Sequence, residues 1–192
     1  MKVLIACEFS GIVRDAFAAK GHDAWSCDII PTDIEGNHIQ DDILNHLDEG
    51  WDLMIAHPPC TYLSNAGARF LYPKGVLNEE RYNKGLEAKK LFMALYNADI
   101  PKICIENPLP SKVYGLPQHS QVIQPYEHGH PFKKRTQLWL KNLSPLLATE
   151  IVCNSESTKV AGNWFNKGGT DRQKNRAKTF IGIAKAMAEQ WG

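Results

Sequence analysis

Two short stretches that are apolar at every position constrain the fold of this chain most strongly. Residues 3–7 read VLIAC and residues 53–56 read LMIA, without the polar–apolar alternation of a strand that has one face in water. Strands of this kind are buried on both faces, and they occur mainly in parallel sheets with helices on either side. We therefore expect central strands of a parallel sheet at 3–7 and at 51–56, where WDLMIA includes the second stretch.

Further strand and helix patterns alternate along the rest of the sequence. Strands are predicted at 23–28, 102–107 and 136–140. Helical spacing of apolar residues covers 10–21, 78–97 and 179–191, and Ser10 and Asn78 are in position to cap the first two of these helices. Because the connections are short, this order predicts an α/β fold with a doubly wound, mainly parallel sheet.

The bulk properties are those of one ordinary domain. The 192 residues suit a single domain over 1–192, and no apolar run approaches the roughly 20 residues of a membrane span. The net charge of +1 does not mark a nucleic-acid binder, so such a role must come from a local patch. The five cysteines have scattered spacing, and the first residues lack a signal-peptide pattern. We expect a cytoplasmic protein without a membrane partner.

The side chains best suited to chemistry follow the predicted strand ends. They are Glu8, Phe9 and Gly11 after the first strand, Asp28 at the end of the second, His57, Pro58 and Cys60 after 53–56, and Glu106 with Asn107 at the end of 102–107. In doubly wound sheets ligands bind beyond the carboxyl ends of the strands, which lie at one edge. This arrangement predicts an enzyme with its site at that edge.

Cys60 is the candidate nucleophile, because the prolines of the stretch HPPC restrict the backbone just before it. A thiol attacks as the thiolate, so the site must lower the pKa of the thiol or supply a base. The alternative is a buried, inert cysteine. Cys7, Cys27 and Cys104 fit that alternative, because they lie within predicted strands.

The other strand-end residues each allow two interpretations. Gly11 allows a ligand to approach the backbone, or it forms a tight turn. Asp28 can accept both ribose hydroxyls of an adenosine-type cofactor, or it can end a turn. Of Asp41 and Asp42, one can cap a short helix and the other can accept a hydrogen bond from an adenine amino group. Glu106 can have a raised pKa and hold a proton near neutrality, or it can form an ordinary salt bridge.

Two segments near the C-terminal end of the chain combine positive charge with other functional groups. In HGHPFKKRTQ, His128 and His130 hint at a metal, but further ligands cannot be assembled, and we expect no metal site. The adjacent Lys133, Lys134 and Arg135 suit an anion. The second segment carries Lys167, Arg172, Lys174, Arg176 and Lys178. It is either a phosphate-binding segment or a solvated charged loop.

Taken together, these motifs resemble those of the cytosine-5 DNA methyltransferases, including compact phage and prophage proteins of that kind. HPPCTYLS resembles the family's P-P-C-Q-x-F-S signature, IENP its E-N-V signature and FKKRTQLWL its later basic strand motif. EFSGIV resembles the cofactor motif F-x-G-x-G, and DDI resembles G-D-I. The last 16 residues resemble the family's final motif, and the resemblance covers nearly the whole chain.

The resemblance implies a fold, a cofactor and residue roles. The fold is that of the Rossmann-like S-adenosylmethionine-dependent methyltransferases, and the cofactor is S-adenosylmethionine. The catalytic residues are Cys60, Glu106, Asn107 and Arg135. The cofactor-binding residues are Glu8, Phe9, Gly11, Asp28, Asp42, Pro58 and Thr179, and the nucleic-acid-binding residues are Lys133, Arg172, Lys174 and Arg176. Cys60 adds to carbon 6 of cytosine, protonated Glu106 binds ring nitrogen 3, and carbon 5 takes the methyl group.

Several departures from the family pattern leave the substrate open. Val13 replaces the second glycine of the cofactor motif, Thr61 replaces Gln, and Pro108 replaces Val. The family inserts a target-recognition domain where this chain has only the segment 141–178. A dimer could supply the missing DNA-binding surface. DNA is the expected partner, and RNA, single-stranded DNA or a free cytidine nucleotide are alternatives. A non-catalytic nucleic-acid-binding protein on a decayed methylase fold is the other reading, and His57 has no assigned role.

Overall fold

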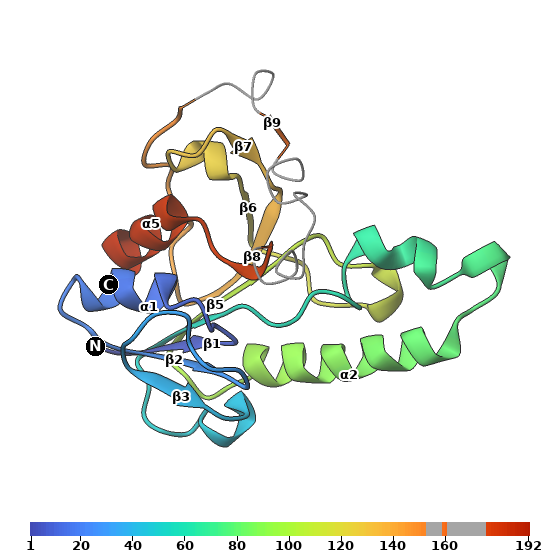
Figure 1. The fold of residues 1–192 in the computed structure, drawn as a ribbon, viewed down its shortest axis with the longest axis horizontal. Helices are drawn as coiled ribbons and strands as arrows, with labels where there is room; N and C mark the ends of the chain where they lie inside the picture. The colour runs from blue at the N-terminus through green and yellow to red at the C-terminus, as the bar shows by residue number, and fades with distance from the viewer. Residues whose placement is uncertain (153–158, 161–175) are drawn as a thin grey trace.

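The computed structural model describes residues 1–152, 159–160 and 176–192, and its centre is a seven-stranded mixed sheet (Figure 1). The strands are β1 (Lys2–Ala6), β2 (Asp23–Asp28), β3 (His38–Gln40), β4 (Leu53–Ala56), β5 (Lys102–Asn107), β6 (Gln121–Ile123) and β8 (Thr136–Lys141). Their order is β3-β2-β1-β4-β5-β8-β6. A separate pair joins β7 (Phe132–Lys133) to β9 (Lys159–Val160).

The five strands from β3 to β5 are parallel, which confirms the expected α/β fold with a mainly parallel sheet. β4 lies between β1 and β5, with Ile55 opposite Ile5 on one side and Cys104 on the other. β8 is antiparallel to both β5 and β6. The carboxyl ends of β1, β2, β4 and β5 therefore meet at one edge, where the sequence predicts the site.

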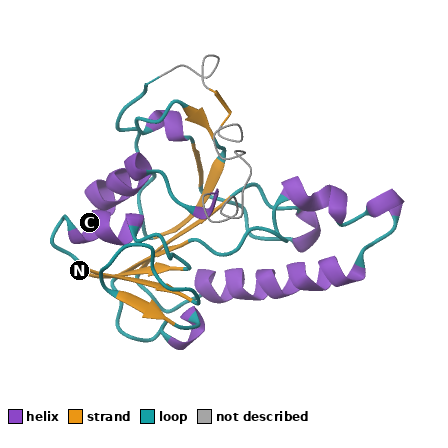
Figure 2. Cartoon of the chain, in the orientation of Figure 1, coloured by secondary structure: helices purple, strands orange, loops and turns teal. Residues whose placement is uncertain are grey.

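In the described part of the chain, α-helices cover both faces of the sheet (Figures 1 and 2). They are α1 (Ile12–Ala18), α2 (Glu79–Tyr96) and α5 (Ile181–Trp191). Short 3-10 helices lie in the connections that the structure describes: η1 (Ile43–Asn45), η2 (Asn65–Phe70), η3 (Pro73–Gly75), η4 (Lys112–Tyr114) and η5 (Pro125–Glu127). No helix in the described part of the chain is both long and apolar enough to cross a membrane.

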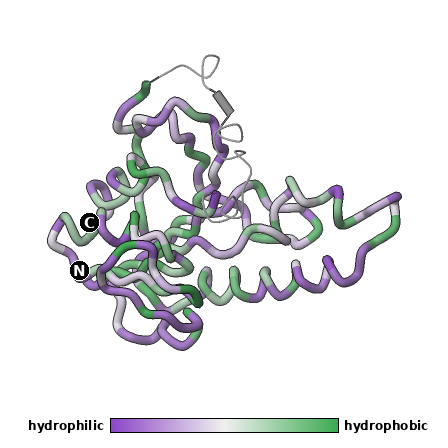
Figure 3. The backbone as a smooth tube through the Cα atoms, in the orientation of Figure 1, coloured by the Kyte–Doolittle hydropathy of each residue, from purple (hydrophilic) through white to green (hydrophobic). Residues whose placement is uncertain are grey.

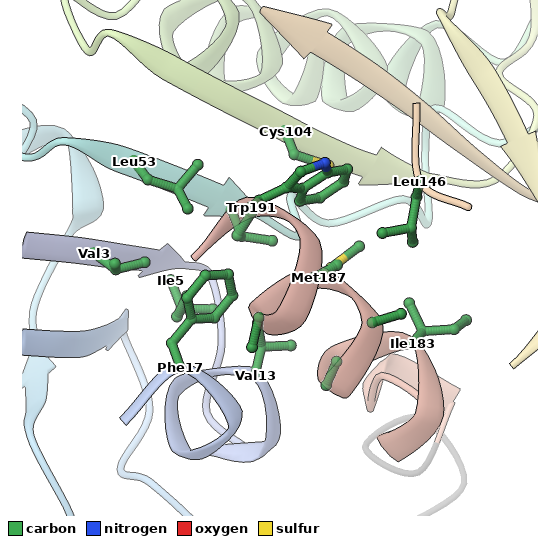
Figure 4. Close-up of a cluster of buried hydrophobic side chains, with 14 of the residues drawn as sticks. Val3, Ile5, Val13, Phe17, Leu53, Cys104, Leu146, Ile183, Met187 and Trp191 are labelled. Atoms are coloured by element: carbon green, nitrogen blue, oxygen red, sulfur yellow. The ribbon is translucent and has the colours of Figure 1, made fainter. Parts of the chain in front are cut away.

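Each face of the sheet has its own hydrophobic core, because successive side chains of a strand point to opposite faces. One core combines Val3, Ile5, Val13, Phe17, Leu53, Ile55, Ile183, Met187 and Trp191, from β1, β4, α1 and α5 (Figure 4). The other combines Leu4, Ala6, Met54, Ala56, Phe92, Leu95, Ile103, Ile105 and Trp139, with α2 as its cover. The all-apolar strands are thus buried on both faces, as expected. In Figure 3, green apolar segments lie in the region of the sheet.

His130 of the H-x-H motif bonds to the start of α5, and the backbone of His128 lies against it. Nε2 of His130 accepts a hydrogen bond from the backbone N–H of Gly182 at 2.9 Å, and Nδ1 of His128 lies 3.2 Å from Oγ1 of Thr149. A Cβ at Gly182 would lie 1.8 Å from the carbonyl oxygen of His128, so only glycine allows this approach. The described residues contain no group of three or more metal-ligating side chains.

Gly85 of α2 provides a stability test, because a Cβ there would lie 2.1 Å from the hydroxyl of the buried Tyr114. Alanine normally stabilises a helix interior by about 1 kcal/mol relative to glycine. We predict that Gly85→Ala instead destabilises the protein by about 1–3 kcal/mol, through overpacking. Urea denaturation measures this effect.

Asn83→Ala is the matched control, since Asn83 is an exposed residue of the same helix. That substitution is expected to be neutral or to stabilise by a few tenths of a kcal/mol, roughly the propensity difference. A stabilising Gly85→Ala would contradict the described packing of α2 on η4.

Candidate functional site

The turn after β1 is organised by Glu8. Its carboxylate accepts hydrogen bonds from the backbone N–H groups of Val13 at 2.8 Å and Arg14 at 3.2 Å, and from the Ser10 hydroxyl at 3.0 Å. Ser10 Oγ accepts only a longer bond from the N–H of Ile12, at 3.3 Å. The main cap of α1 is therefore Glu8, whereas the sequence predicted Ser10. The Glu8 side chain, expected to contact the cofactor, is 4% exposed and already bonded to the helix.

Gly11 makes room for a buried arginine. Its φ is +72°, and a Cβ would lie 2.6 Å from Nη2 of Arg14. The Arg14 guanidinium is 1% exposed and donates to Ser26 Oγ, to Thr32 Oγ1 and to the carbonyl oxygens of Ile34 and Glu35. The structure shows a tight turn at Gly11, and Arg14 secures the loop after β2.

The acids expected to bind the cofactor cluster at the carboxyl ends of β1 and β2. Asp28 is partly buried, and its Oδ1 accepts from the N–H of Ile30 at 3.2 Å. Burial raises the pKa of Asp28, and the charges of Asp28 and Asp42 add to the effect of burial in raising the pKa of the Cys7 thiol. Asp42 accepts from the N–H of Leu44 at 3.0 Å and so caps η1.

This acid cluster fits the adenosine part of S-adenosylmethionine. A carboxylate offers about four acceptor positions, so Asp28 and Asp42 keep acceptors for ribose hydroxyls and an adenine amino group. Asp41 is committed locally, to the N–H of Asp42 and to the side chains of Asn45 and His46. Cys7 lies one residue beyond β1, with φ +57°, rather than within the strand as predicted.

The C-terminal segment returns to the same edge. Nζ of Lys178 lies 2.7 Å from Oδ2 of Asp33, and the N–H of Asp33 donates to the carbonyl oxygen of Phe9 at 2.8 Å. Phe9 is buried, and Thr179, next to Lys178, is partly buried. Lys178, the neighbour of Thr179, is thus linked through Asp33 to Phe9, and the family resemblance assigns both Thr179 and Phe9 to the cofactor.

Cys60 lies on a loop that is tied to the end of β5. Nδ2 of the buried Asn107 donates to the carbonyl oxygen of Pro58 at 3.0 Å, and the N–H of Ser64 donates to the Cys60 carbonyl at 2.9 Å. Pro58 is buried and the Cys60 side chain is partly exposed. The loop therefore presents the thiol at the edge while its base stays fixed between β4 and β5.

His57 is the partner of Glu106. Its Nδ1 lies 3.3 Å from Oε2 of Glu106, and the two side chains are only 7% and 19% exposed. Burial raises the pKa of the Glu106 carboxyl, but the His57 hydrogen bond and the positive charge of Lys134 outweigh it, so the pKa lies below its usual value. The expectation of a raised pKa for Glu106 is therefore wrong for the free protein.

The Cys60 thiol has a raised pKa. Burial is the main cause, the negative charge of Glu106 adds to it, and Lys134 and Arg176 act in the opposite direction. In the free protein this edge therefore holds a protonated thiol beside an ionised carboxylate. The thiol becomes a nucleophile only when its proton is removed.

Lys134 is a cation of the site that contains Cys60 and Glu106. Its charge acts on both Cys60 and Glu106, and its N–H donates to Oε1 of Gln124 at 3.0 Å. Arg135 is exposed and makes no hydrogen bond or ion pair within the described residues, and Lys133 lies in β7. Arg176 is exposed and close enough to affect Cys60, whereas Arg172 and Lys174 lie outside the described residues.

Several buried polar atoms at this edge have no hydrogen-bond partner among the described residues. They are Nε2 of His57, Oδ1 of Asn107, and both Oε1 and Nε2 of Gln137. Asn107 and Gln137 are opposite each other in the β5–β8 pairing. Unpaired buried amides are costly, and they gather where a polar ligand can bind them. Gln137 was missed in the sequence because nothing local distinguishes it from a strand residue.

No protein-family model matches this chain, and no curated protein matches it either. The resemblance to the cytosine-5 DNA methyltransferases therefore rests on the motifs, and family membership stays a prediction. The geometry adds an acid cluster on one side of the edge and a Cys–Glu–His–Lys group on the other. Such a site can hold an adenosine-type group and offer a thiol and a carboxyl to a second molecule.

The electrostatic description of Cys60 can be tested by alkylation. We predict that Glu106→Gln speeds the reaction of Cys60 with iodoacetamide at pH 8, because it removes a charge that raises the pKa of the thiol. Lys134→Gln should slow the reaction, because it removes a charge that lowers that pKa. Peptide mass spectrometry reports Cys60 separately from the other cysteines.

Lys133→Gln is the matched control and should leave the rate of Cys60 alkylation unchanged. Equal effects of Lys133→Gln and Lys134→Gln would show that only net charge matters and would contradict the assignment of Lys134.

Proposed function

We propose that this protein transfers a methyl group from S-adenosylmethionine to carbon 5 of cytosine in DNA, with Cys60 as the nucleophile. The observation that carries the proposal is the junction of β4 and β5. There the Asn107–Pro58 hydrogen bond holds the Cys60 loop beside Glu106, close enough for the carboxylate to raise the pKa of the thiol. A nucleophile and an acid so placed suit a pyrimidine ring that must be attacked at carbon 6 and held at nitrogen 3.

Asp28, Asp42 and the edge near Phe9 and Thr179 would hold the cofactor, which would supply the methyl group. Cys60 adds to carbon 6 of the cytosine and forms a carbon–sulfur bond, while neutral Glu106 donates a hydrogen bond to ring nitrogen 3. Carbon 5 takes the methyl group and loses its proton to a base, and the carbon–sulfur bond then breaks to release Cys60. His57 is the positioning residue of Glu106, because it fixes one carboxyl oxygen.

The protonation states of Cys60 and Glu106 explain why the thiol is unreactive in the free protein. Cys60 holds a proton and Glu106 lacks one, whereas the reaction needs the reverse. Passage of one proton from the thiol to the carboxylate generates both reactive forms at once. Binding of the pyrimidine favours this state, because neutral Glu106 gains an acceptor at ring nitrogen 3 and the ring takes up the electron pair of the thiolate.

The same protonation states also fit a second candidate, a nucleic-acid-binding protein without catalysis. A protonated thiol and an ionised carboxylate are the resting forms of an inert site as well. Methyl transfer separates the two candidates, because only the enzyme moves a methyl group.

We predict that the protein labels cytosine-containing DNA with a tritiated methyl group and that Cys60→Ala reduces transfer below detection. Duplex DNA, single-stranded DNA, RNA and dCMP should be compared in parallel. Cys27→Ala is the matched control, since Cys27 is buried and burial raises the pKa of its thiol to about 11. Normal transfer by Cys60→Ala would exclude this mechanism, and label in none of the substrates would favour the binding protein.

Cofactor binding gives an independent prediction. Calorimetry should show binding of S-adenosylmethionine by the wild type and a roughly 10- to 100-fold loss in Asp28→Asn, as expected for a charge-assisted hydrogen bond. Asp48→Asn, a change at an exposed acid, should bind like the wild type. Equal affinities of all three proteins would contradict the assigned role of Asp28.

A further inference from the structure

A hollow of about 360 Å³ lies beside the loop that carries Cys60. Tyr62 and Phe70 line it from the loop and η2, and Arg81 and Lys84 line it from α2. In Figure 1, η2, η3 and the first half of α2 form an arm that extends away from the sheet. Tyr62, the first lining residue in the sequence, is two residues after Cys60. The lining residues of this hollow are not among those of the site described above.

Arg81 is fixed at the wall of this hollow. Its Nη2 donates to the carbonyl oxygen of Thr61 at 2.9 Å, and a Cβ at Gly67 would lie 2.5 Å from the same nitrogen. The guanidinium carbon lies 5.1 Å from the ring centre of Tyr62 and 5.5 Å from that of Phe70. The cation thus bridges two aromatic rings and is bonded to the residue that follows Cys60.

Phe70 and Lys84 of this lining are accessible to a ligand. Phe70 is 52% exposed, although it is a large apolar residue. The side chain of Lys84 is 51% exposed, and its Nζ lies 5.8 Å from the ring centre of Tyr62. Arg69 lies over the Phe70 ring at 4.6 Å. Phe70 is thus an exposed ring and Tyr62 a partly exposed one, both beside cations. Accessible rings beside cations are the combination that holds single-stranded nucleic acid, by base stacking and phosphate contacts.

Charge supports this occupant. Arg81 and Lys84 line the hollow against one acid, Glu80, and Arg69 lies over the ring of Phe70. The wall of the hollow therefore carries a net positive charge. Bases in a duplex are stacked on one another, so exposed protein rings can stack only on bases that have left a duplex or never belonged to one.

We propose that this hollow binds single-stranded nucleic acid and holds the nucleotides next to the base that reaches Cys60. The inference rests on the proposed function for the chemistry at Cys60, and it specifies the substrate as an unpaired strand. Tyr62 and Phe70 stack on bases, and Arg81 and Lys84 contact the phosphates. The arm thus supplies strand-binding surface next to the nucleophile within one chain.

Fluorescence anisotropy with labelled 12-mers tests this inference without methyl transfer. The probes are a thymine-only strand, the corresponding uridine strand, and a duplex of the thymine strand with its complement. We expect the wild type to bind both single strands at least about tenfold more tightly than the duplex. Phe70→Leu should weaken single-strand binding at least about fivefold, as expected for the loss of a stacked base.

Two lysines of α2 provide a matched pair. Lys84 pairs with Glu80 and Lys90 pairs with Glu87, and both lysines are exposed, but only Lys84 lines the hollow. Lys84→Gln should reduce the slope of log affinity against log salt by about 0.7 for a single strand, and Lys90→Gln should leave it unchanged. Circular dichroism checks that every variant is folded.

Equal binding of duplex and single strands, or normal single-strand binding by Phe70→Leu and Lys84→Gln, would overturn this inference. Such a result with methyl transfer to duplex DNA would leave the proposed function intact. Preferential single-strand binding without any methyl transfer would support the inference and exclude the proposed function.

Discussion

The candidate site depends on one hydrogen bond between neighbouring strand ends, from the Asn107 amide at the end of β5 to the carbonyl oxygen of Pro58 after β4. Parallel strands β4 and β5 bring their carboxyl ends together, but a flexible loop there would leave Cys60 free to move. The prolines restrict that loop, and the buried Asn107 fixes its base. Cys60 and Glu106, which are distant in the sequence, thereby share one edge of the sheet.

The electrostatics of this edge oppose reaction in the free protein. Glu106 is held as an anion by His57 and Lys134, and burial together with the charge of Glu106 raises the pKa of Cys60 and keeps its thiol protonated. A ligand that accepts a hydrogen bond from neutral Glu106 removes the contribution of the Glu106 charge to the raised pKa of Cys60. The rate of any reaction at Cys60 is therefore expected to depend on what binds at Glu106, which ties the reactivity of the thiol to the presence of its substrate.

Local patterns were sufficient for the central strands and for α2, whose predicted range of 78–97 differs by one residue at each end from Glu79–Tyr96. The three-residue strands β3 and β6 were missed, because so few residues show no periodicity. Lys133, Lys134 and Arg135 are adjacent and all suit an anion, so the sequence could not show that the charge of Lys134 acts on Cys60 and Glu106. The His57–Glu106 pair spans 49 residues, so no local pattern could indicate it.

The central claim is that Cys60 forms a covalent bond with carbon 6 of a cytosine. Incubation with S-adenosylmethionine and a strand that contains 5-fluorocytosine tests this most directly, because fluorine at carbon 5 blocks the proton loss that releases the thiol. Peptide mass spectrometry should then find the nucleotide attached to Cys60, with no adduct in Cys60→Ala. An adduct on another residue, or none on Cys60 from any strand or nucleotide while the cofactor is bound, would contradict the account.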